Sequence, residues 1–371
     1  MQMLPAMPTT IDKAAWNTNY TFVFVHGVSG WGSYDLPYRI MPYWGMLGGD
    51  LIPFLNKQGF STCAASVDPN GSAWDRACEL YAQLVGTRVD YGSAHAKKYG
   101  HERFGKDFTG RALVSAFDAT HKLNLIGHSF GGTTIRMLAH LLAHGDADEQ
   151  SAAHCSDISP LFTGGKGDWV HSLTTLATPH NGTTAYCDHS GNEKRMGPPL
   201  QRAMTSVMGS LARKVPRGRG GDDLAEYDMY IDNALRLNEK LTTSPSLYYF
   251  SYPCCTTERQ ADGKCTPVKA CTEQMFRATA EIIGAMYGMT RGGFVFDETW
   301  RDNDGLVNTI SARAPFDAPQ QDFDAANIRR GVWNIMPVTQ GDHMAPEGGL
   351  FIVRGVRPLF LEHLNRINCL P

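Results

Sequence analysis

A serine lies at the centre of the segment with the clearest chemical pattern in the chain. Gly127, Ser129 and Gly131 form a Gly-x-Ser-x-Gly motif, which follows the apolar run 122–126. A helical pattern of apolar residues begins directly afterwards, at 133–142. This strand–turn–helix context is typical of a nucleophile elbow, in which a sharp turn lifts the serine out of a sheet. We therefore expect Ser129 to be a nucleophile, the alternative being an ordinary glycine-rich turn.

A second segment has the composition expected of an oxyanion hole. The β-branched and aromatic run 20–25 predicts a strand, and it ends in His26-Gly27 at the start of a glycine-rich loop. In α/β hydrolases, a loop of this kind supplies one backbone N–H to the oxyanion and the residue after the nucleophile supplies the other. Val28 and Phe130 are the expected donors. Taken alone, the loop could be a plain turn at the end of a strand.

A serine hydroxyl becomes nucleophilic when an imidazole accepts its proton and a carboxylate orients the imidazole. In this fold the chain order is serine, acid, histidine, with each group after a strand. His343 follows a strand-like run, whereas His363 lies in a helical pattern and is interpreted as a surface or packing residue. For the acid, spacing alone leaves three candidates open, which are Asp304, Asp302 and Asp297.

Predicted strands alternate with predicted helices along the whole chain, which favours an α/β fold with a mostly parallel sheet and helices on both faces. No internal repeat or linker is apparent, so we expect one domain, 1–371, that carries insertions. The expected strands are 20–25, 60–67, 122–127, 170–175, 248–252 and 332–338, and the clearest expected helices are 49–58, 74–86, 133–142 and 359–367.

Composition limits the class of protein. Lys and Arg total 34 against 37 acidic residues, so the charge gives no sign of a nucleic-acid partner. No apolar run reaches the roughly 18 residues that a membrane span requires. The first 19 residues lack the apolar core of a signal peptide, which leaves a cytosolic protein and a mature secreted form with an added Met as alternatives. The sequence carries no signal for an oligomeric state.

Nine cysteines are many for a cytosolic enzyme. Cys254, Cys255, Cys265 and Cys271 fall in one polar stretch, which favours a loop with disulfide bonds and a secreted protein. A metal-binding thiol cluster is the competing interpretation, although the spacing lacks the paired C-x-x-C pattern of a zinc ribbon.

Taken together, these motifs resemble one family, the zinc-containing thermoalkalophilic bacterial lipases and their staphylococcal relatives. The resemblance extends from about residue 23 to about residue 343 in the same order. It rests on His26-Gly27 with Gly30-Trp31-Gly32, 74–79, 81–86, Asp90-Tyr91-Gly92, 101–105, His128-Ser129, 177–180, Asn303-Asp304-Gly305 and Asp342-His343. It implies a lipase of the α/β-hydrolase fold with Ser129 as nucleophile, Asp304 as acid and His343 as base.

The family also holds a structural zinc ion with two Asp and two His residues. The resemblance places these ligands at Asp75, His95, His101 and Asp223 and implies a zinc-binding subdomain inserted at 68–108. Carboxylate and imidazole ligands suit tetrahedral zinc. The family's calcium site is in doubt here, because its carboxylate two residues past the catalytic histidine is replaced by Ala345.

The segment 185–225 corresponds to the family's lid and is shorter here. Within it, residues 199–215 place Leu, Met and Val on one helical stripe, surrounded by Lys and Arg. We expect a short helical lid that covers Ser129 in water and turns its apolar face to a lipid surface, such as a membrane or lipid droplet. An ordinary surface helix is the alternative.

The sequence therefore predicts a lipase that hydrolyses acylglycerol esters at a lipid interface. A phospholipase or a carboxylesterase for short soluble esters is the nearest alternative. Two alternatives of other classes are a catalytically idle binding protein with this fold and a hydrolase in which zinc is the catalyst.

Overall fold

A seven-stranded parallel sheet forms the centre of the protein. The structure is a computed structural model, and it describes residues 11–152, 157–187 and 221–371. The strand order is β13-β14-β7-β6-β5-β1-β2, and each neighbouring pair is parallel. In that order the strands are Gln320–Asp322, Trp333–Ile335, Tyr248–Tyr252, Val170–Leu176, Leu123–His128, Thr21–Val25 and Thr62–Ala65.

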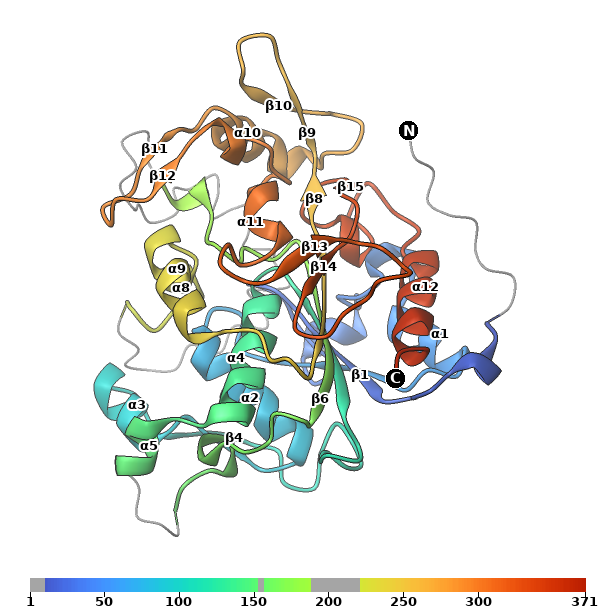
Figure 1. The fold of residues 1–371 in the computed structure, drawn as a ribbon, viewed down its shortest axis with the longest axis vertical. Coiled ribbons are helices and arrows are strands. Elements are labelled where there is room, and N and C mark those ends of the chain that lie inside the picture. Colours follow the sequence, from blue (N-terminus) through green and yellow to red (C-terminus); the bar gives the residue numbers. More distant parts are fainter. Residues whose placement is uncertain (1–10, 153–156, 188–220) are drawn as a thin grey trace.

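Helices cover both faces of this sheet (Figure 1). Helices α2 (Ala73–Val85) and α4 (Phe130–His144) pack on one face, where Val23 and Val25 of β1 point. Helices α1 (Leu51–Lys57) and α12 (Arg357–Asn368) pack on the other face, with Phe22 and Phe24. Alternate residues of β1 thus enter two separate cores, as expected for a strand buried on both sides. The predicted α/β-hydrolase architecture is confirmed.

The remaining elements lie in the connections between these strands and helices. The short helices are α3 (Ser93–Tyr99), α5 (Ala147–Ala152), α8 (Ala225–Asp228), α9 (Ile231–Lys240), α10 (Gln274–Gly284) and α11 (Thr309–Arg313). Four two-stranded sheets join β3 (Arg88–Asp90) to β4 (Phe104–Asp107), β9 (Thr257–Arg259) to β10 (Cys265–Pro267), β11 (Gly288–Met289) to β12 (Val295–Phe296), and β8 (Cys254–Cys255) to β15 (Thr339–Gln340).

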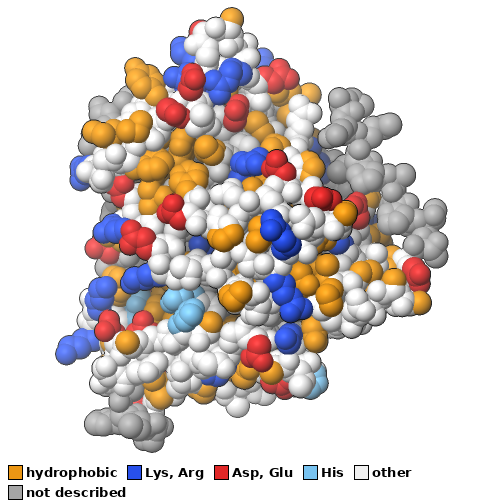
Figure 2. Space-filling model, viewed as in Figure 1, with side chains coloured by type: hydrophobic (Ala, Val, Ile, Leu, Met, Phe, Trp, Pro, Cys, Tyr) orange, Lys and Arg blue, Asp and Glu red, His pale blue; other side chains and the backbone are white. Residues whose placement is uncertain are grey.

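Two features of the surface are visible in the space-filling view. Acidic and basic side chains are interspersed over the face shown in Figure 2, and a hydrophobic group lies over α10 and the β11–β12 hairpin. Tyr287, Met289 and Val295 are the exposed hydrophobic residues of this hairpin region.

No helix among the described residues is long and apolar enough to cross a membrane. The stripe at 199–215, on which the lid prediction depends, lies outside the described residues.

Candidate active site and metal site

Ser129 occupies the sharp turn between β5 and α4. Its backbone has φ +54° and ψ −130°, a left-handed conformation that a residue with a side chain adopts only when its surroundings impose it. The flanking glycines make room for this turn, because a Cβ atom on Gly127 would lie 2.4 Å from the carbonyl carbon of Gly131. The Gly-x-Ser-x-Gly spacing therefore has a steric cause in this structure.

His343 lies beside Ser129 although 214 residues separate them in sequence. The His343 Nε2 atom is 2.8 Å from the Ser129 Oγ atom, and both side chains are buried. The loop that carries His343 follows the short strand β15, and the His343 N–H donates a hydrogen bond to the Asp304 carbonyl. His343 and Asp304 are thus hydrogen-bonded through the backbone as well as through their side chains.

Asp304 is the carboxylate that contacts His343. Its Oδ2 atom is 2.8 Å from His343 Nδ1, and its Oδ1 atom accepts hydrogen bonds from the N–H groups of Leu306 and Val307. The two other candidates point elsewhere. Asp302 accepts a hydrogen bond from the Cys265 thiol, and Asp297 caps the short helix 298–300. The structure therefore brings together Ser129, His343 and Asp304 and places the other two carboxylates outside this group.

The loop after β1 packs directly against the serine. A Cβ atom on Gly27 would lie 2.7 Å from the Ser129 Cβ atom, so only glycine permits this approach. Val28 then lines the same pocket as Ser129, while Phe130 starts helix α4. The two segments predicted to supply oxyanion donors thus both adjoin the serine.

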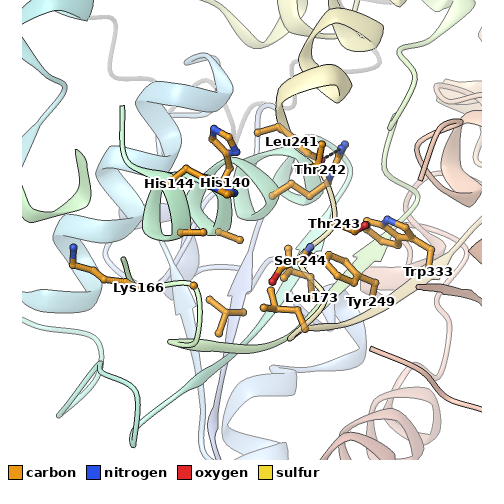
Figure 3. A pocket seen from close by; sticks show the side chains of 16 residues that line it. His140, His144, Lys166, Leu173, Leu241, Thr242, Thr243, Ser244, Tyr249 and Trp333 are labelled. Carbon is orange, nitrogen blue, oxygen red and sulfur yellow. Dashed lines mark hydrogen bonds between the residues drawn. The ribbon is translucent and has the colours of Figure 1, made fainter. Parts of the chain in front are cut away.

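The pocket above Ser129 is mainly apolar. Its lining residues are Val28, Ser29, Trp31, Met41, Tyr43, Met46, His128, Ser129, Met275, Phe276, Leu306, His343, Met344 and Leu350. A second pocket lies beside the C-terminal half of α4, with Lys166 on one side and Tyr249 and Trp333 on the other, and it is also lined by His140 and His144 (Figure 3). That pocket shares no residue with the first, so we assign the chemistry to the pocket that holds Ser129.

Sequence reasoning missed a buried network behind the base. The His128 Nε2 atom donates to the carbonyl of His343 at 2.8 Å, so its Nδ1 atom accepts from the Tyr43 hydroxyl at 2.6 Å. Burial lowers the pKa of His128 well below 6.5, which keeps this ring neutral. The Glu347 carboxyl lies 3.1 Å from the same Nδ1 atom, and burial raises the pKa of Glu347 well above its usual range. The only available signal was that His128 directly precedes Ser129.

A carboxylate also fixes the chain that follows His343. The Glu273 Oε1 atom accepts hydrogen bonds from the N–H groups of Leu350, Phe351 and Ile352 at 3.0, 2.6 and 2.7 Å. Glu273 N–H in turn donates to Asp342, the residue before His343. Glu273, which directly precedes helix α10, thus links the start of that helix to the chain on both sides of His343.

The four residues predicted to bind metal form one compact cluster. One ligand atom from each of Asp75, His95, His101 and Asp223 lies within 4.8 Å of the others. The His101 Nδ1 atom is 2.9 Å from the Glu102 carbonyl, so the Nε2 atom is the one directed into the cluster. It lies 3.3 Å from the Asp223 carboxylate, and the His95 Nε2 atom lies 3.1 Å from that of Asp75. Two imidazole nitrogens and two carboxylates that converge in this way are a donor set that fits a metal ion.

The four clustered cysteines are free thiols in the described structure. Cys254, Cys255, Cys265 and Cys271 form no disulfide bond with any described cysteine. Cys265 donates to Asp302 and Cys271 lies 3.5 Å from the Thr256 hydroxyl. The predicted disulfide-bonded loop is therefore not confirmed.

The sheet, the serine elbow and the order of the three side chains define an α/β-hydrolase fold. The chain belongs to the family whose model is described as "Lipase-like, C-terminal domain", which matches residues 18–218 and 217–349. Its relatives include Lipase 2 of Staphylococcus aureus, 35% identical over 356 residues that cover 88% of this chain and 50% of that protein. The chain thus spans about half the length of the curated relatives it matches.

Solved structures give the same assignment. EstA from Clostridium botulinum has a TM-score of 0.83 and 29% identity, covering 99% of this chain and 92% of EstA. Staphylococcus hyicus lipase has a TM-score of 0.77 and 32% identity, covering 95% of this chain and 97% of that structure. The predicted resemblance to the staphylococcal lipases is confirmed.

Proposed function

We propose that the protein is a serine carboxylic-ester hydrolase, a lipase that cleaves acylglycerols. The observation that carries this proposal is the continuous hydrogen-bonded path from Ser129 Oγ through the His343 ring to Asp304. His343 Nε2 accepts the Ser129 proton as Oγ attacks the ester carbonyl, and Asp304 stabilises the imidazolium that results. His343 then donates that proton to the departing alcohol, which leaves an acyl-enzyme on Ser129.

The second half of the reaction uses the same groups. His343 accepts a proton from water, the hydroxide attacks the acyl carbonyl, and the proton returns to Ser129 as the fatty acid leaves. In both halves the negative oxygen of the tetrahedral intermediate is stabilised by the backbone N–H groups of Val28 and Phe130. Loss of one such donor typically costs about 100-fold or more in kcat, so these two segments are essential to the proposal.

The surroundings of the pocket favour a lipid substrate over a short soluble ester. Three large apolar residues near the pocket are well exposed, at 71% for Ile40, 61% for Leu47 and 76% for Phe351. Each is next in sequence to a residue that lines the pocket. Large exposed apolar residues next to a pocket are typical of a surface that contacts apolar partners. We propose that this rim rests on the lipid surface while the ester enters, together with the predicted lid at 185–225.

The contribution of the rim can be tested with Leu47→Ser and Phe351→Ser. Both changes should lower hydrolysis of emulsified triacylglycerol about tenfold and leave hydrolysis of p-nitrophenyl acetate within twofold, since they remove only surface contact. Phe104→Ser on β4 is the matched control, because Phe104 is exposed but neither of its sequence neighbours lines the pocket. An unchanged rate on the emulsion in both variants would argue against this rim and for a carboxylesterase, the alternative that the name of EstA also suggests.

The metal cluster serves the fold in this proposal. We propose zinc, held by Asp75, His95, His101 and Asp223 as four protein ligands of a closed structural site that pins the inserted segment 68–108. Bound there, zinc would stabilise the fold and would not contact the ester.

Secretion stays a prediction, and it would place the enzyme where external lipid is available.

The first experiment is turnover of p-nitrophenyl esters of increasing acyl length by wild type and Ser129→Ala. Activity that rises with chain length and disappears in Ser129→Ala would establish the lipase. No activity in either protein would favour the binding protein, whereas activity that survives in Ser129→Ala but is lost on chelation would favour zinc catalysis.

A further inference from the structure

A buried arginine connects the two segments that the proposed oxyanion hole requires. Arg76 lies in the first turns of α2 and is fully buried, which is rare for a charged side chain unless it is paired or hydrogen-bonded. Its guanidinium Nη2 atom donates to the His26 carbonyl, and its Nη1 atom donates to the Asp68 carbonyl at 2.8 Å and lies 3.4 Å from the Gly27 carbonyl. The chain immediately before Val28 is therefore held by this one side chain.

The same guanidinium also holds the start of α4. Arg76 Nε donates to the Thr134 hydroxyl at 2.8 Å, and that hydroxyl donates to the Phe130 carbonyl at 3.1 Å. The Arg76 Cζ atom lies 5.4 Å from the centre of the Phe130 ring, within the range of a cation–π contact. Both segments that supply oxyanion donors, at Val28 and at Phe130, are thus anchored to one rigid, planar group.

Charge and burial suit this role. Burial lowers the pKa of Arg76 to about 10, so the side chain remains a cation at neutral pH, and Asp68 and Glu79 oppose that shift. A cation is costly to bury, and here its N–H groups are directed at carbonyl oxygens and a hydroxyl. Lysine offers a single point charge and cannot reproduce a fork that reaches several acceptors at once.

We propose that Arg76 is the positioning residue of the oxyanion hole, which sets the distance between the Val28 and Phe130 N–H groups. The inference rests on the proposed function, because it concerns the transition state of ester hydrolysis. Arg76 does not touch the ester. It acts through the backbone, and a misplacement of a donor by about 1 Å is enough to cost roughly 100-fold in rate.

The test compares Arg76→Lys with Arg136→Lys. Arg136 is a second buried arginine, on α4, whose pKa is also lowered to about 10 by burial, and it donates to Asn238 and Leu241 on the far side of that helix. Both changes should lower the melting temperature. Only Arg76→Lys should lower kcat for p-nitrophenyl butyrate, by about 10- to 100-fold per folded molecule with KM within twofold, because the loss falls on the transition state.

A second measurement separates positioning from stability. The rate at which a p-nitrophenyl phosphonate ester modifies Ser129 should fall in Arg76→Lys by the same factor as kcat, since the phosphoryl oxygen occupies the oxyanion hole. Thr134→Val, which removes the link to Phe130, should show a smaller loss of the same kind and covers the case in which Arg76→Lys does not fold. Thr134→Val and Arg76→Lys should also be non-additive.

The outcomes separate this inference from the proposed function. If Arg76→Lys and Thr134→Val match Arg136→Lys in kcat and in phosphonate reactivity, the positioning role is wrong while the lipase assignment stands. If the wild type shows no turnover and Ser129 does not react with the phosphonate, the proposed function itself fails.

Discussion

Two buried clusters in this protein are both built from aspartate and histidine side chains, but their hydrogen-bond donors and acceptors are arranged differently. In one, each oxygen of Asp304 accepts from an N–H group, and the His343 ring lies between that carboxylate and the Ser129 hydroxyl. In the other, the His101 Nε2 atom lies 3.3 Å from the Asp223 carboxylate, and both belong to a group of two imidazoles and two carboxylates directed at one point. The clusters meet on helix α2, where Asp75 belongs to the metal cluster and its neighbour Arg76 contacts the oxyanion segments.

The difference shows that residue type alone does not decide the chemistry of such a cluster. In the first cluster donors alternate with acceptors, so the His343 imidazole can take up the serine proton while the Asp304 carboxylate stabilises the imidazolium. In the second, two imidazole nitrogens and two carboxylates converge on one point, which is a donor set that suits a cation. The arrangement of donors and acceptors thus separates a candidate proton-transfer site from a candidate metal site.

The largest expected effect tests the donor–acceptor alternation at Asp304. Asp304→Asn should lower kcat by roughly 10³- to 10⁴-fold with little change in KM, because an amide favours the wrong tautomer of His343. Steady-state kinetics on p-nitrophenyl butyrate measure this effect. Asp302→Asn, two residues away, is the control and should stay within twofold of wild type, and equal losses in the two variants would remove the distinction drawn here.

The metal cluster should respond in stability more than in chemistry. His101→Ala should abolish stoichiometric zinc binding and lower the unfolding free energy, by about 4 kcal/mol where free zinc exceeds its Kd a thousandfold. Metal analysis and thermal unfolding with and without chelator measure both effects. A chelator should lower the melting temperature of wild type and leave that of His101→Ala unchanged. The contrast between the two clusters breaks down if chelation instead stops turnover while the protein remains folded.

The smallest expected effect concerns the chain after His343. Glu273→Gln weakens the acceptor of three backbone N–H groups and should cost about 1–3 kcal/mol of stability with a few-fold loss of kcat. Thermal unfolding and kinetics measure the two quantities. Calcium and a calcium-selective chelator should change neither quantity in wild type, and activation by calcium would show that a cation site exists after all.

Much of the fold could be predicted because the sheet strands have distinctive apolar runs. The strand 248–252 is found at the predicted bounds, and the runs 20–25 and 170–175 differ from the observed strands by one residue. Strand β13 was not predicted, since its residues Gln320–Asp322 are polar and pair only at the edge of the sheet. His363 was interpreted as a surface or packing residue, and it is a packing residue, buried with its ring hydrogen-bonded to Thr174 and Tyr252. A periodic pattern identifies a buried helix face, but it does not show that a polar side chain finds partners there.

By itself, the sequence determined the elbow and the order of the reactive residues, because Gly-x-Ser-x-Gly between a strand and a helix depends only on local sterics. The metal ligands and the choice of Asp304 came from the resemblance to a family. Only the tertiary structure decided which carboxylate meets His343, that Glu273 binds the chain after it, and that Arg76 joins the two oxyanion segments. These contacts link residues tens to hundreds of positions apart, and no local pattern reports which distant groups the packing of two cores brings within hydrogen-bond distance.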